Sequence, residues 1–111
     1  DKLSNGRLGY VHVRGMDGIK AVNEYGIALR ALNNELETLR ALPFSALENG
    51  SHSFRSRTPE LERLVRPKGV CVIKDCAGVP DLKEVQVSLR WTGEHGRLIE
   101  KQLTTLIAKK R

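Results

Sequence analysis

The sequence has few aromatic residues, few cysteines and no long hydrophobic run. Aromatic residues make up 5% of the 111 residues, so aliphatic side chains must form most of the core. No run of about 18 or more apolar residues occurs, so we expect no membrane-spanning helix. The pattern of a signal peptide is also absent. Two cysteines are too few to hold a zinc ion without other ligands.

The two cysteines, Cys71 and Cys76, leave two interpretations open. Their spacing matches neither a zinc knuckle nor a C-x-x-C redox pair. A Cys71–Cys76 disulfide would close a tight loop around Val72–Asp75 and would indicate an oxidising compartment. The alternative is two free thiols, one of them buried, and pairing cannot be decided from sequence alone.

The formal net charge of +6 raises the question of nucleic-acid binding. The basic residues are spread along the chain, and their densest run, Lys109–Arg111, is a terminal tail. Aromatic platforms between basic residues, which single-strand binders use, are absent. We therefore expect no nucleic-acid partner, and a basic nucleic-acid-binding α+β domain stays an alternative.

A long amphipathic helix is the clearest element of the sequence. Apolar residues recur in steps of three and four within Glu24–Phe44, which predicts one apolar stripe. Asp17 is a candidate cap, and Pro43 should end the helix near Leu42. Gly26 costs about 1 kcal/mol relative to Ala, and close approach of a neighbouring helix or simple exposure would explain it. The stripe comprises Tyr25, Ala28, Leu29, Leu32, Leu36 and Leu39.

The second half of the chain predicts an antiparallel sheet. Ser45–Arg57 is polar and predicts a loop, and Thr58–Pro59–Glu60 predicts a capped short helix that ends at Pro67 and Gly69. Alternation in the second of three predicted strands places one face in the core and one in solvent. Lys101 suits an edge strand. The strands are Gly69–Asp75, Lys83–Trp91, with Val85, Val87, Leu89 and Trp91 on one face, and Arg97–Ala108.

These elements predict an α+β fold in which the long N-terminal helix packs on a three- to four-stranded antiparallel sheet. We expect Leu32, Leu36 and Leu39 to belong to the core of this fold.

Residues 1–18 differ in pattern from the rest of the chain. The alternation of Leu8–Arg14 predicts a short strand, and the segment resembles the strand that opens the catalytic domain of tail-specific and tricorn-type serine proteases. The serine, lysine and oxyanion segments of such an enzyme have no counterpart downstream. We interpret 1–18 as a stray strand or an added leader and 19–111 as the domain, and keep a protease-related fragment as an alternative.

Catalytic and metal-binding residues are not indicated. The candidate nucleophiles are not in a G-x-S-x-G motif, and the histidines lack further ligands at suitable spacing, so we expect no enzyme, no metal and no cofactor. These residues are Ser4, Ser45, Ser51 and Ser53, and His12, His52 and His95.

Three segments resemble minor pilins and pseudopilins of the type IV pilin superfamily, in particular small minor pilins of the PilV type and the I-type pseudopilin of type II secretion. They are Ala28–Leu47, similar to the exposed half of the pilin helix, Lys83–Arg97, similar to the valine-rich strand and hairpin, and Leu103–Arg111, similar to the closing strand. The resemblance implies a non-enzymatic, periplasmic filament subunit whose partners are other minor pilins or pseudopilins. The family's peptidase site and hydrophobic N-terminal anchor are not found, so membrane attachment would depend on that missing anchor.

The filament interpretation gives the helix two tasks, because one end would contact neighbouring subunits while the other packs on the sheet. The residues expected at the partner interface are Ile19, Val22, Tyr25, Gly26 and Leu29. Some members of the family bind calcium, but no Asp-rich loop supports it here.

Overall fold

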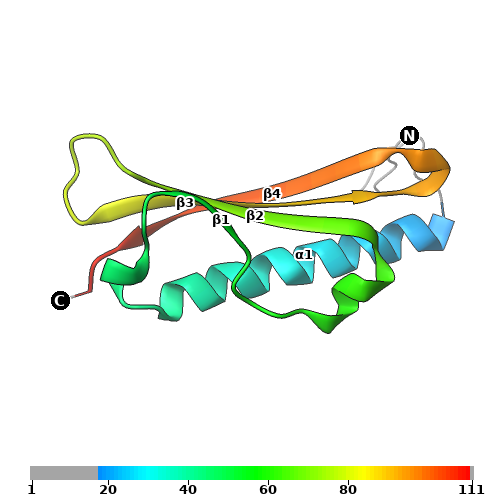
Figure 1. Ribbon diagram of the computed structural model, residues 1–111, viewed down its shortest axis with the longest axis horizontal. Helices are drawn as coiled ribbons and strands as arrows, with labels where there is room; N and C mark the ends of the chain where they lie inside the picture. Colours follow the sequence, from blue (N-terminus) through cyan, green and yellow to red (C-terminus); the bar gives the residue numbers. More distant parts are fainter. Residues whose placement is uncertain (1–17, 111) are drawn as a thin grey trace, which may run out of the picture.

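A computed structural model describes residues 18–110, which form one long helix and a four-stranded antiparallel sheet in the order β1-β2-β3-β4 (Figure 1). This confirms the predicted α+β fold. Each strand pairs with its neighbour in sequence, so β1 and β4 are the edges. The elements are α1 (Gly18–Ala41), β1 (Gly50–Ser53), β2 (Val65–Asp75), β3 (Leu82–Thr92) and β4 (Leu98–Ala108), with the 3₁₀ turns η1 (Phe44–Ala46), η2 (Pro59–Arg63) and η3 (Glu94–Gly96).

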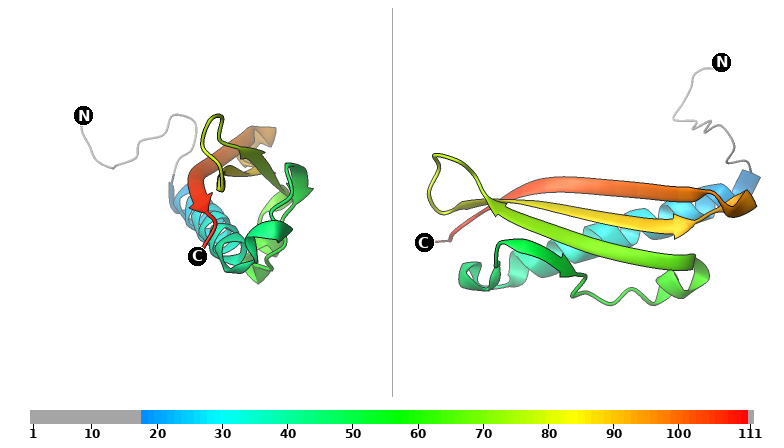
Figure 2. Two further views of the ribbon diagram at one scale, coloured as in Figure 1. Left: turned by 90° about the vertical axis from the view of Figure 1, so that its left-hand side faces the viewer. Right: turned by 45° about the horizontal axis from the view of Figure 1, so that its top comes forward.

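The core lies between α1 and the inner face of the sheet, and α1 runs along β3 and β4 (Figure 2). Trp91 is fully buried and is the largest side chain in the core. The predicted inner face of β3 is confirmed, because Val85, Val87, Leu89 and Trp91 are all 0% exposed. Leu32, Leu36 and Leu39 are buried, as expected.

Two carboxylates of α1 face the core, which the sequence pattern did not predict. The Glu24 carboxylate accepts a hydrogen bond from the Trp91 indole nitrogen at 3.1 Å. Glu35 is 0% exposed. Its carboxylate accepts the Arg55 amide at 3.0 Å to each oxygen and the Ser56 amide at 2.8 Å. Glu35 therefore binds the connection between α1 and β2 to the helix.

The sequence prediction was wrong in the connection between α1 and β2. The predicted loop Ser45–Arg57 contains β1, which pairs with Val70–Ile73 of β2. A polar edge strand lacks apolar alternation, so its sequence resembles a loop. The short helix ends at Arg63, and β2 begins at Val65 with an irregularity before Lys68.

Thr58 also has a different role from the predicted helix cap. Its hydroxyl makes no capping bond and instead accepts a hydrogen bond from the Asn34 side chain of α1 at 3.0 Å. Asn34 thereby helps to fix the start of η2 against the helix.

The predicted strand within residues 8–14 and the Asp17 cap lie outside the described residues. Within residues 18–110, no helix is long and apolar enough to cross a bilayer.

Replacing Glu35 tests whether its carboxylate stabilises the fold. Glu35→Ala leaves two partly buried backbone amides without their charged acceptor, so we expect the free energy of unfolding to fall by about 2–4 kcal/mol. Urea denaturation followed by circular dichroism measures the change. Glu37→Ala, at an exposed position of the same helix, is the control and should change stability by less than about 0.5 kcal/mol. Equal effects of the two variants would contradict the role of Glu35.

Candidate partner interface

An exposed apolar stripe runs along the first half of α1. Ile19 is 78% exposed, Val22 65% and Leu29 52%. At about 100° per residue, these side chains lie on one side of the helix, and Gly26 lies between them. The core-facing residues Ala21, Ala28 and Leu32 lie on the opposite or adjoining side. We call Ile19, Val22, Gly26 and Leu29 the outer stripe.

The same side of α1 becomes polar after Leu29. Asn33, Glu37 and Arg40 continue the outer stripe at helical spacing, and all three are exposed. Arg40 turns toward the sheet and donates to the Thr105 hydroxyl of β4 at 2.7 Å. The large exposed apolar side chains of α1 thus all lie between Ile19 and Leu29.

Tyr25 is positioned differently from the other predicted interface residues. It is half-buried, and its ring meets the Trp91 ring edge-on with centroids 6.2 Å apart. The Lys101 ammonium lies 4.4 Å from the centroid of the Tyr25 ring, a cation–π geometry. Tyr25 therefore makes its main contacts inside the domain.

Leu29 was placed in the core stripe by the sequence pattern, but the structure does not bury it. Because it is 52% exposed, it belongs to the outer stripe, as the interface prediction also proposed.

Gly26 has no packing requirement within the described domain. A Cβ atom at this position would meet only the Arg30 guanidinium, with the nearest nitrogen at 3.4 Å. That guanidinium makes two hydrogen bonds of 2.9 Å to the Glu60 carboxylate of η2. Contacts inside residues 18–110 therefore do not explain a glycine in the middle of a helix.

The two cysteines are free thiols, and the disulfide considered from sequence is not formed. Residues 71–75 are extended in β2, which separates the Cys71 and Cys76 Cα atoms by roughly 16 Å, far beyond disulfide range. Burial raises the pKa of the Cys71 thiol to about 11, and the Glu35 carboxylate adds to this rise while Arg55 opposes it. Cys71 is therefore a core residue rather than a nucleophile.

The described serines and histidines do not form a catalytic arrangement. Ser45 is exposed in η1, and Ser51 and Ser53 are exposed on β1. His52 forms a 2.7 Å hydrogen bond through Nε2 with the Glu48 carbonyl, and His95 is exposed in η3. Within residues 18–110, no three His, Cys, Asp or Glu side chains gather as metal ligands. Ser4 and His12 lie outside the described residues.

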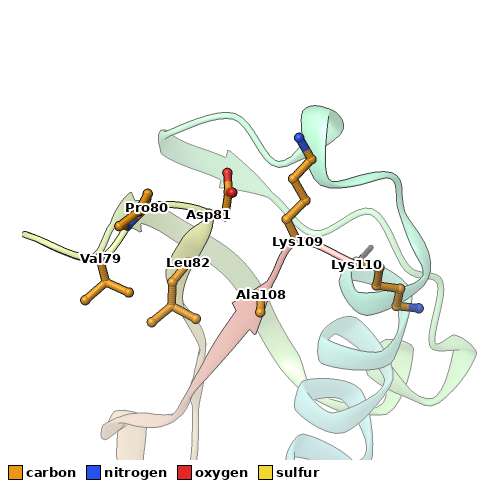
Figure 3. A pocket seen from close by; sticks show the side chains of 7 residues that line it. All are labelled: Val79, Pro80, Asp81, Leu82, Ala108, Lys109 and Lys110. Atoms are coloured by element: carbon orange, nitrogen blue, oxygen red, sulfur yellow. The ribbon is translucent and has the colours of Figure 1, made fainter.

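An open depression of about 600 Å³ lies where the β2–β3 turn meets the end of β4 (Figure 3). Residues 79–82 and 108–110 line it. The side chains of Lys109 and Lys110 do not converge on one point in this view, and Asp81 is the one carboxylate in the lining. The depression therefore lacks a set of groups aimed at a common ligand.

Comparison of the chain with protein-family models, with curated proteins and with solved structures gives no match. The candidate site thus depends on the geometry of the chain itself, and the outer stripe is its most distinctive surface.

The Gly26→Ala variant tests whether the glycine serves the isolated domain. Because a methyl group would meet only the Arg30 guanidinium, at an ordinary contact distance of 3.4 Å, we expect the free energy of unfolding to rise by about 0.5–1 kcal/mol. Chemical denaturation of the purified chain measures the change. A loss of stability would mean that the domain itself requires Gly26.

Alkylation tests the two thiols. At about pH 8, iodoacetamide should modify Cys76 in the native chain and spare Cys71 until the chain unfolds. Because the folded Cys71 thiol keeps its proton up to about pH 11, its contribution to stability is complete below about pH 8.5 and is lost as the pH rises toward 11. Mass spectrometry of Cys71→Ser and Cys76→Ser variants identifies the modified residue. Alkylation of Cys71 in the folded chain would contradict its burial in the core.

Proposed function

We propose that this chain is a non-enzymatic subunit of a type IV pilus or a type II secretion pseudopilus, and that it assembles with other minor pilins or pseudopilins through the outer stripe of α1. The observation that carries the proposal is the exposure of Ile19, Val22 and Leu29 on the side of the helix that faces away from its own sheet. The sequence resemblance to minor pilins supplies the kind of partner.

The outer stripe has the chemistry of a helix–helix contact. Complete burial of one large aliphatic side chain is worth about 1.5–3 kcal/mol, so Ile19, Val22 and Leu29 together supply enough for a specific contact. Gly26 lies between them and has no Cβ, which allows another backbone to approach closely. A contact between two different surfaces of successive subunits can propagate along a filament.

The polar half of α1 supports the division of the helix into two parts. From Asn33 onward the outer side carries polar and charged residues, while the inner side remains buried against β3 and β4. The outer side of the first three turns would therefore meet the neighbouring subunit, while the inner side of the whole helix, Glu24 and Ala28 included, holds the sheet. Under this proposal the domain functions in the periplasm.

A binding experiment tests the partner surface. The immobilised chain is incubated with soluble domains of minor pilins and pseudopilins, and Leu29→Glu should weaken binding at least tenfold because it places a charge in an apolar contact, a loss of about 1.4 kcal/mol or more.

Asn33→Glu is the matched control. It adds the same charge on the same side of α1, one turn beyond the apolar residues, and should leave binding unchanged. Circular dichroism confirms that both variants fold. Unchanged binding by Leu29→Glu, or equal losses in both variants, would contradict the assignment of the outer stripe.

A further inference from the structure

The outer edge of β4 is long and regular. All eleven residues of β4 pair with β3, from Leu98 opposite Thr92 to Ala108 opposite Leu82, without a register shift. Within residues 18–110 no strand lies on the far side of β4. The other edge, β1, has four residues. An eleven-residue edge offers a complete template for another strand.

The backbone groups on this edge can be assigned from the ladder. The Lys109 amide donates to the Asp81 carbonyl at 2.9 Å, and the Gly93 amide donates to the Arg97 carbonyl at 2.7 Å, continuing the β3–β4 pairing at its two ends. Both bonds join odd-numbered residues. Because antiparallel residues alternate, the odd-numbered residues of β4 bond to β3 and the even-numbered ones direct N–H and C=O outward. The outward-facing residues are Leu98, Glu100, Gln102, Thr104, Leu106 and Ala108.

The edge lacks most features that prevent strand addition. It has no proline, no glycine and no bulge. Lys101 is the one lysine of β4, and its ammonium lies over the Tyr25 ring on the inner face. Glu100 is the one acidic residue of β4.

Two exposed leucines of β4 lie symmetrically about Gln102. Leu98 is 69% exposed and Leu106 is 55% exposed, and the two leucines lie at equal distances from Gln102 along the strand. Side chains alternate between the two faces of a sheet along a strand. All three residues are even-numbered, so their side chains lie on the face of the sheet that points away from α1.

We propose that two copies of this chain pair β4 with β4 in antiparallel orientation about a two-fold axis at Gln102. Leu98 then opposes Leu106 of the second copy, and the same pair recurs on the other side of the axis. Glu100 opposes Thr104 of the second copy, so no like charges are directly opposed. The two sheets become one, and the outward-facing N–H and C=O groups around the axis gain partners.

The geometry also predicts the strength of the dimer. The contact is isologous and closes at two copies, and it places the two α1 helices antiparallel, unlike a filament in which subunits follow one another. An edge-to-edge contact is small, and interfaces below roughly 1,200 Å² are typically transient. Each chain carries a net charge of +6, so dimerisation should strengthen as salt screens the repulsion.

Cross-linking tests the two-fold axis. In the full chain with Cys76→Ser, Gln102→Cys places two thiols opposite each other, where Cα atoms of a hydrogen-bonded pair lie about 5.5 Å apart, within disulfide range. Mild oxidation should give a covalent dimer on a non-reducing gel. The control is Ser88→Cys, which faces Gln102 from β3 on the same face of the sheet and should stay monomeric. Equal cross-linking of the two variants, or none with Gln102→Cys, would overturn the proposal.

A charge exchange tests the register. Sedimentation velocity over a concentration series should show that Leu98→Lys and Leu106→Glu each weaken dimerisation at least tenfold, and that the double variant recovers most of the loss. The two positions are about 26 Å apart within one strand, so their charges cannot pair inside one chain. A double variant that dimerises no more tightly than the single variants would exclude this register.

A wild-type chain that stays monomeric at high concentration would overturn the proposal. These tests need no pilin partner, so their failure would leave the proposed function untouched.

Discussion

The fold depends on the burial of one side of α1 against β3 and β4. Trp91, near the end of β3, lies at one end of this contact, where its fully buried indole donates to the Glu24 carboxylate of the helix. Tyr25 packs edge-on against the same indole, and Lys101 covers the Tyr25 ring from β4. A domain with few aromatic residues thus places one tryptophan where the helix and two strands meet, and the aliphatic core extends from that point.

Most of the architecture could be predicted from the sequence because it follows from side-chain periodicity. The steps of three and four in α1 and the alternation from Val85 to Trp91 each indicate a buried face, and the structure confirms the strand face and the helical stripe apart from Leu29. The short strand β1 could not be found in this way, since its register is set by pairing with β2 rather than by apolar alternation. The buried Glu35 was missed for a related reason, because a carboxylate in a helix is expected in solvent unless its partners, here backbone amides, are known.

The candidate interface was predicted only in part. Periodicity placed Leu29 in the core stripe as well as in the predicted partner surface, and in the structure its side chain is exposed. Tyr25 was expected at the partner surface, but its contacts with Trp91 and Lys101 depend on how α1 lies relative to the sheet. The backbone groups at the outer edge of β4 could not be predicted from the sequence, because the pairing with β3 decides which residues point their N–H and C=O groups away from the sheet.

The Glu35 carboxylate binds main-chain amides and no side chain of the connection. Any residue other than proline supplies the same amide, so the contact with Glu35 does not itself restrict the side chains at positions 55 and 56. Divergence between relatives that this contact governs should therefore be uneven, with an acidic residue retained in the helix and no such constraint on the two side chains beside it.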